Sequence, residues 1–214
     1  MKSIYIIGAG GFAREVVWLI ERINEQEPSW NIEGFIDDNI EIHGKELMSY
    51  PVLGGIDYLS DIDKNINCVL AIGSSDVKEK IYSKLSLLNH IEFPNLIDPS
   101  VLYSKSVKLG KGNIICAGSI LTVDIELKNF VTVNLDCTIG HDVEINDFVT
   151  IYPSVNVSGN VIVGKNSELG TGTQIIQGKN IGEFTIVGAG SVVVKDLPNK
   201  IVAVGSPAKA IKER

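Results

Sequence analysis

The chain has 214 residues, 44% of them hydrophobic, and a formal net charge of −7, which suits two modest globular domains. Residues 1–96 hold eight Lys or Arg against fifteen Asp or Glu, whereas residues 97–214 hold eleven of each, and this distribution argues against nucleic-acid binding. No apolar run is long enough to cross a bilayer, no cleavable signal pattern opens the chain, and the three cysteines form no CxxC pair. We therefore predict a cytoplasmic protein with reduced thiols and no membrane span.

A strand, a glycine turn and a helix are predicted at the start of the chain. The apolar residues 3–7 end in the turn GAGGFA at 8–13, and apolar residues from 16 to 23 follow at helical spacing. This arrangement presents backbone N–H groups and a helix N-terminus to a phosphate.

Two further strands of this first half end in polar residues. Residues 34–36 lead into Asp37 and Asp38, where such folds contact a ribose or a base. An alternative for this acidic pair is a solvated turn. Residues 68–72 lead into the turn 73–76, which starts a second helix.

From residue 97 to residue 193 an aliphatic residue returns at every sixth position, with one aromatic exception. The series is Ile97, Tyr103, Leu109, Ile115, Leu121, Leu127, Val133, Ile139, Ile145, Ile151, Val157, Val163, Leu169, Ile175, Ile181, Val187 and Val193. Neither a helix nor an antiparallel strand keeps such a period. It predicts a hexapeptide solenoid in which each repeat is one short strand and one turn.

Three hexads per coil give a triangular prism with at least five coils. Small or β-branched residues four positions after each series member also point inward, and Cys137 belongs to this core set. A glycine often follows the series member directly, as Gly110 and Gly140 do, and we expect it to accommodate corner backbone angles that other residues disfavour.

The glycine turn also fits the G-x-G-x-x-A pattern of dinucleotide dehydrogenases. Fewer than a hundred residues precede the solenoid, which is too few for two mononucleotide-binding halves and a substrate domain. The turn could instead serve only helix–strand packing, since the motif alone is weak.

His141 is the candidate catalytic residue. It lies between the inward residues Ile139 and Val143 and should face outward near a corner, and Asp142, the next residue, can orient its imidazole. The alternative is a solvated surface pair. One solenoid histidine cannot supply the three ligands of a zinc site, so we expect no metal.

Six segments resemble the bacterial nucleotide-sugar acetyltransferases of the left-handed β-helix superfamily, in particular the sialic acid O-acetyltransferase type and its UDP-4-amino-sugar N-acetyltransferase relatives. They are IIGAGGFAREV (6–16), FIDD (35–38), AIGSSDVKEKIYSKL (71–85), NLIDPS (95–100), IGHD (139–142) and VGSPAK (204–209). The resemblance implies a Rossmann-like nucleotide-sugar-binding domain at 1–94. It implies a left-handed parallel β-helix with a C-terminal cap at 95–214, which binds acetyl-CoA and carries the catalytic residues.

The resemblance also implies a homotrimer with acetyl-CoA between adjacent solenoids. His141 matches the general base, Asp142 the carboxylate that orients it, and Gly159 a backbone oxyanion donor. The nucleotide pocket is matched by Gly10, Gly11, Phe12, Asp37, Asp38 and Gly73, and the coenzyme site by Thr150, Thr171 and Ala189. No metal is implied.

Three residues depart from the family pattern. Phe12 and Thr150 replace histidines, and Asp142 replaces a residue that is often Glu. The expected activity is acetyl-CoA-dependent acetylation of the amino group of a UDP- or dTDP-linked 4-amino-4,6-dideoxy sugar, for glycan or surface-polysaccharide synthesis. The alternatives are O-acetylation of sialic acid or another sugar, and a noncatalytic trimeric nucleotide-binding partner.

Overall fold

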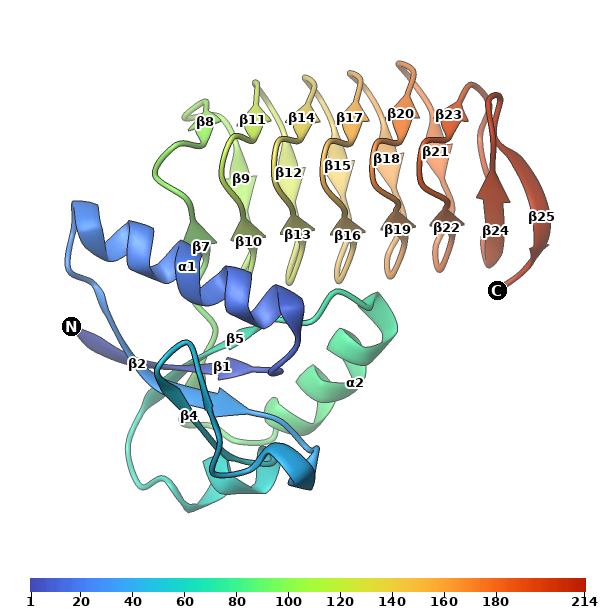
Figure 1. Cartoon of the computed structure of the whole chain (residues 1–214). Coiled ribbons are helices and arrows are strands. Elements are labelled where there is room, and N and C mark those ends of the chain that lie inside the picture. Colours follow the sequence, from blue (N-terminus) through green and yellow to red (C-terminus); the bar gives the residue numbers. More distant parts are fainter.

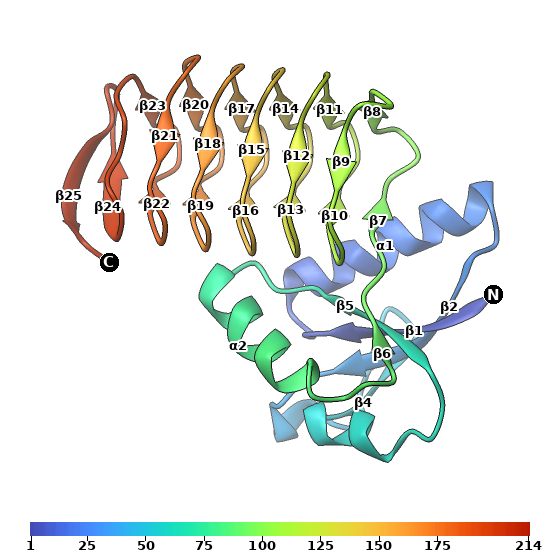
Figure 2. The same ribbon diagram turned by 180° about the vertical axis from the view of Figure 1, so that it is seen from behind.

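The computed structural model describes all residues 1–214 and shows an α/β domain docked against a long ladder of short strands (Figures 1 and 2). The α/β sheet has the order β3-β4-β2-β1-β5-β6, parallel except where β3 pairs with β4. Its elements are β1 (Lys2–Ile7), α1 (Gly11–Gln26), β2 (Trp30–Ile36), β3 (Glu46–Leu47), β4 (Tyr50–Gly54), β5 (Ile66–Leu70), α2 (Ser75–Leu85) and β6 (Ile91–Glu92), with 3₁₀ turns at Ile40–Ile42 and Ile56–Asp61.

Successive side chains of β1 point alternately into the two hydrophobic cores of this domain. Ile4 and Ile6 pack with the buried residues of α1, whereas Tyr5 and Ile7 lie in the cluster that contains Leu85 of α2. Because successive side chains of a strand point to opposite faces, the two helices cover opposite sides of the sheet. The strand, glycine turn and helix predicted at the start of the chain are confirmed.

The second half is a triangular parallel β-helix with three sheets. The first sheet contains β7 (Leu96–Ile97), β10 (Ile114–Ile115), β13 (Thr132–Val133), β16 (Thr150–Ile151), β19 (Glu168–Leu169), β22 (Ile186–Val187), β24 (Ile201–Val204) and β25 (Lys209–Glu213). The second contains β8 (Leu102–Tyr103), β11 (Ile120–Leu121), β14 (Thr138–Ile139), β17 (Asn156–Val157), β20 (Gln174–Ile175) and β23 (Val192–Val193). The third contains β9 (Lys108–Leu109), β12 (Glu126–Leu127), β15 (Glu144–Ile145), β18 (Ile162–Val163) and β21 (Asn180–Ile181).

Each coil takes three hexads, since partners in register differ by 18 residues, as Thr132 and Thr150 do. The predicted Rossmann-like α/β domain followed by a left-handed parallel β-helix is confirmed. The predicted inward column is present in the 25-residue core of the β-helix, and Cys137 is fully buried in it. The first coil departs from the prediction, because Tyr103 is 53% exposed where the column ends.

The glycines that follow the inward residues need a different explanation from the expected one. Left-handed backbone occurs three positions after the inward residue, as at Asp124 and Asp142, and not at these glycines. A Cβ on Gly140 would lie 2.7 Å from the amide nitrogen of Gly159, and one on Gly170 would lie 2.6 Å from that of Ala189. The expected reason, backbone angle, was therefore wrong. These positions are glycine because the next coil passes too close for a side chain.

Both helices of the α/β domain contact the β-helix. Leu96 and Ile114 join the core beside α1, and Arg22 of α1 donates two hydrogen bonds, of 2.6 and 3.0 Å, to the buried carboxylate of Asp98. At the corner between the third and first sheets, the rings of Phe130 and Phe148 stack at 5.3 Å and pack on α2 in one cluster. The α/β domain is thus docked on its own β-helix through both of its helices.

Candidate functional site

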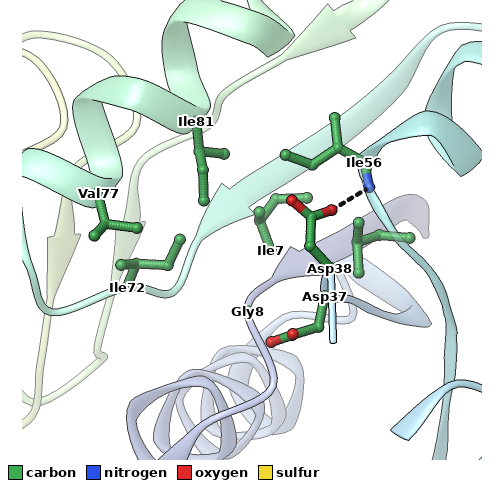
Figure 3. A pocket seen from close by; sticks show the side chains of 9 residues that line it. Ile7, Gly8, Asp37, Asp38, Ile56, Ile72, Val77 and Ile81 are labelled. Atoms are coloured by element: carbon green, nitrogen blue, oxygen red, sulfur yellow. Dashed lines mark hydrogen bonds between the residues drawn. The ribbon is translucent and has the colours of Figure 1, made fainter. Parts of the chain in front are cut away.

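A cavity of about 310 Å³ opens at the carboxyl ends of β1 and β2, beside α2 (Figure 3). Asp37 and Asp38, the acidic pair predicted for a nucleotide pocket, both line this cavity. Asp37 accepts a hydrogen bond from the Ala9 amide at 2.9 Å, and Asp38 accepts one from the Ile56 amide at 3.0 Å. The remaining lining residues are Ile7, Gly8, Ile36, Ile56, Ile72, Val77 and Ile81.

The glycines of the first turn divide into two kinds. Gly8 has a φ of +100°, and a Cβ there would lie 3.1 Å from the carbonyl oxygen of Ala71, so the fold itself requires glycine. Around Gly10 and Gly11 a Cβ would meet nothing closer than 4.0 Å. Since α1 begins here with unpaired backbone N–H groups, the open space suits an anion.

A second pocket, of about 110 Å³, lies between α1 and the first sheet of the β-helix. Phe12, Gly73 and Thr150, three residues singled out from the sequence, line it together. Thr150 is buried and its hydroxyl donates to the Gly73 carbonyl at 2.7 Å. The structure therefore places Thr150, predicted for the coenzyme site, between the two domains with Phe12 and Gly73, which were predicted for the nucleotide pocket.

Four other lining residues of this interdomain pocket escaped the sequence analysis: Glu15, Thr132, Asn134 and Tyr152. Asn134 is only 7% exposed, and its side-chain oxygen accepts from the Leu135 amide at 2.7 Å. Its Nδ2 donates to no group of the chain and so offers a donor to a ligand. The missed signal is the polar residue on either side of an inward residue of the first sheet: Thr132 and Asn134 flank Val133, and Tyr152 follows Ile151.

His141, Asp142 and Gly159 lie together at the corner between the second and third sheets. The Nδ1 of His141 is 2.8 Å from the Asp142 carboxylate, and both side chains are about half exposed. A Cβ on Gly159 would come within 2.5 Å of the His141 ring atoms Cε1 and Nε2, so the imidazole lies directly over this glycine. With Asp142 accepting from Nδ1, Nε2 is left to accept a proton.

The amide of Gly159 has no hydrogen-bond acceptor in the chain. On either side of it, the Ser158 amide donates to the Ile175 carbonyl at 3.0 Å and the Asn160 amide to that of His141 at 2.8 Å. This N–H therefore faces outward beside the imidazole, where it can bind an oxyanion.

Thr171 and Ala189 lie at a different corner of the prism, between the first and second sheets. Both are exposed, and one glycine separates each of them from the end of β19 or β22. Within one chain the structure does not bring them to His141, which follows β14 on the edge away from the α/β domain (Figures 1 and 2).

Other kinds of chemistry find little support. The chain has no group of three or more His, Cys, Asp or Glu arranged to hold a metal ion. Burial raises the pKa of Cys68 and Cys116 to about 12 and that of Cys137 to about 11, so these thiols are poor nucleophiles. No helix combines the length and apolar character needed to cross a membrane.

Residues 3–85 match the family model of the PglD N-terminal domain. The whole chain is similar to WeeI from Acinetobacter baumannii AYE, with 30% identity and a TM-score of 0.89 over 99% of this chain and 100% of that one. It is also similar to the H141N variant of perosamine N-acetyltransferase from Caulobacter crescentus in complex with CoA and GDP-perosamine (28% identity, TM-score 0.88, 100% and 98% covered).

A third similar structure is the acetyltransferase domain of PglB from Neisseria gonorrhoeae in complex with acetyl coenzyme A (27% identity, TM-score 0.88, 98% and 99% covered). Curated relatives are named acetyltransferases, but the first of them align over only 51 to 56 residues, or 27 to 28% of their length.

Proposed function

Because the chain belongs to the hexapeptide-repeat acetyltransferases with a PglD-type N-terminal domain, we propose that it acetylates a nucleotide-linked amino sugar. The acetyl donor is acetyl-CoA, and the acceptor is the amino group of a 4-amino-4,6-dideoxy sugar used in glycan or surface-polysaccharide synthesis. The observation that carries the proposal is the cluster of His141, Asp142 and Gly159, where a free imidazole nitrogen lies beside a free backbone N–H.

The reaction needs one base and one oxyanion donor. The sugar amine attacks the thioester carbonyl carbon while Nε2 of His141 takes a proton from the nitrogen. The N–H of Gly159 binds the oxygen of the tetrahedral intermediate. Collapse breaks the carbon–sulfur bond, and the imidazolium returns its proton to the CoA thiolate, so the products are the amide and CoA. General base catalysis of this kind contributes roughly 10²–10⁴-fold, and positioning contributes the rest.

The two pockets offer consecutive places for the acceptor. The base and ribose fit the cavity beside Asp37 and Asp38, and the diphosphate fits the open N-terminus of α1 at Gly10 and Gly11. The sugar then reaches the interdomain pocket, where Phe12 supplies an apolar face. The chain was expected to use UDP or dTDP, whereas the similar perosamine enzyme holds a GDP sugar, so all three nucleotides belong in the test.

A homotrimer brings together the catalytic residues and the substrate pockets, which lie apart in one chain. His141 lies on the edge of the prism away from its own α/β domain, and Thr171 and Ala189 lie at another corner. Packing the prisms side by side brings one chain's His141 corner to the coenzyme corner and the pockets of its neighbour. In this arrangement the backbone N–H groups of Thr171 and Ala189 bind the coenzyme.

The test is a His141→Ala variant assayed for CoA release with acetyl-CoA and UDP-, dTDP- and GDP-linked 4-amino-4,6-dideoxy sugars. We expect kcat to fall by roughly 10²–10⁴-fold with little change in melting temperature, because the ring is half exposed. The control is His90→Ala, whose ring bonds only to the Leu59 carbonyl. Turnover within a few-fold of the unmodified protein would remove His141 from the mechanism.

A parallel assay with free sialic acid decides between N- and O-acetylation. Faster CoA release with sialic acid than with every nucleotide amino sugar would replace the proposed acceptor. Nucleotide binding without any acetyl transfer would identify the chain as a noncatalytic partner.

A further inference from the structure

The first sheet presents a row of polar outward residues to the segment that starts α2. Three consecutive coils each bind one residue of this segment through a polar side chain. In the coils before and after them, the same strand position is occupied by the apolar residues Ile114 and Ile186. The pairs are Thr132 with Lys78 Nζ (3.1 Å), Thr150 with the Gly73 carbonyl (2.7 Å), and Glu168 with the Ser75 amide and hydroxyl (3.1 and 2.9 Å).

Glu168 makes more of these contacts than its neighbours in the row. Its side chain is 14% exposed, and one oxygen accepts from Ser75 and from Arg214 at 3.3 Å. The other oxygen accepts from the Tyr152 hydroxyl at 3.2 Å. Burial, and secondly the Glu168 charge, raise the pKa of Tyr152 to about 12, so the hydroxyl remains a donor.

Glu168 bonds to Tyr152, which lines one pocket, and to Ser75, which lies between residues that line the other. Tyr152 and Gly73 line the interdomain pocket, and a Cβ on Gly73 would already lie 3.4 Å from the Tyr152 hydroxyl. Ile72 and Val77, on either side of the Ser75 anchor, line the cavity next to Asp37 and Asp38. One carboxylate thus connects the β-helix to the wall shared by the two sites.

We propose that Glu168 is a positioning residue for the acceptor: it holds the start of α2 and the Tyr152 side chain so that the two pockets keep a fixed spacing. The proposal rests on the proposed function, since it assigns both pockets to one nucleotide sugar. Glu168 touches no reacting atom, and its carboxylate bonds to Ser75, Tyr152 and Arg214 and to neither Thr171 nor Ala189 of the coenzyme corner. Its loss therefore weakens acceptor binding and leaves the acetyl-CoA side unchanged.

The experiment compares Glu168→Gln and Tyr152→Phe with the unmodified protein in steady-state assays that vary each substrate in turn. Gln keeps the side-chain volume but loses the charge that the surrounding donors share. We expect the KM for the nucleotide sugar to rise about tenfold or more in Glu168→Gln and less in Tyr152→Phe, with kcat and the KM for acetyl-CoA within about twofold. Glu144→Gln is the matched control, because Glu144 holds the same strand position on the third sheet.

Two results would overturn the inference. One is an unchanged KM for the nucleotide sugar in Glu168→Gln. The other is a parallel rise of both KM values with a lower melting temperature, which a merely structural residue would produce.

Nucleotide affinity separates this inference from the proposed function. Calorimetry with UDP, dTDP and GDP should give a Kd about tenfold weaker for Glu168→Gln than for the unmodified protein. If the unmodified protein acetylates no nucleotide amino sugar but binds one of these nucleotides, the proposed function fails alone, and the affinity of the variant decides the inference. If it binds none of them, both are wrong.

Discussion

At the scale of single residues, Gly159 has a steric role besides the chemical one proposed for it. The imidazole of His141 lies over its Cα, so a methyl group at this position has to displace the ring. We predict that Gly159→Ala lowers kcat by roughly tenfold to a hundredfold by moving Nε2 out of line, since small misplacements of a catalytic group are costly. The measurement is steady-state CoA release together with the pH profile of kcat.

The control for this substitution is Gln177→Ala, one coil further along the same corner and exposed. It should leave kcat unchanged. A Gly159→Ala protein with the turnover of the unmodified chain would show that neither the ring position nor the amide at 159 matters.

At the scale of elements, α2 carries a buried amine into the domain interface. Lys78 donates to the carbonyl oxygen of Phe130 at 2.9 Å, to Thr132 at 3.1 Å and to the carbonyl oxygen of Val149 at 3.4 Å. Burial lowers its pKa to about 7, although the nearby Glu168 charge opposes the shift. The unfolded chain, with an ordinary lysine, therefore binds more protons than the folded chain between pH 7 and about 10.

It follows that Lys78 makes folding stability rise with pH across this interval, by at most about 1.4 kcal/mol per pH unit. We predict that Lys78→Met removes this contribution, so that its free energy of unfolding rises less steeply between pH 7.5 and 9 than that of the unmodified protein. Urea unfolding at fixed protein concentration measures both slopes. Lys80→Met, on the exposed side of the same helix, should keep the original slope, and equal slopes for Lys78→Met would contradict the assignment.

At the scale of the whole molecule, the proposed site is shared between chains, which predicts complementation. His141→Ala removes the base. Gly10→Trp should block the anion site without disturbing the fold, because Gly10 has a φ of −79° and open space around it. Each variant alone should be inactive, whereas mixed trimers purified after co-expression should recover about a third of the activity, since every trimer that contains both variants pairs the two intact halves in one of its three sites.

Co-purification through two different tags followed by a CoA-release assay measures this recovery. Activity no greater than the sum of the two separate variants would mean that His141 and the nucleotide pocket act within one chain. That result would contradict the proposed sharing of the site between neighbouring chains.

The sequence alone determined the architecture, because the signals for it are local and repeated. A six-residue period specifies which side chain each short strand buries, and a glycine turn between a strand and an amphipathic helix specifies the start of an α/β domain. The same register directs His141 outward beside Asp142. Tyr103 broke the pattern in the sequence and is also the position where the column opens to solvent.

Only the tertiary structure decided which distant residues meet. The α/β domain docks on the first sheet through side chains that follow no repeating pattern in the sequence. It joined Phe12 and Gly73 with Thr150, buried Lys78, and brought Glu168 to Ser75 across 93 residues of sequence. It also showed why a glycine follows many of the inward residues. The distance between coils excludes a Cβ there, and that distance is a property of the stacked coils rather than of any one hexad.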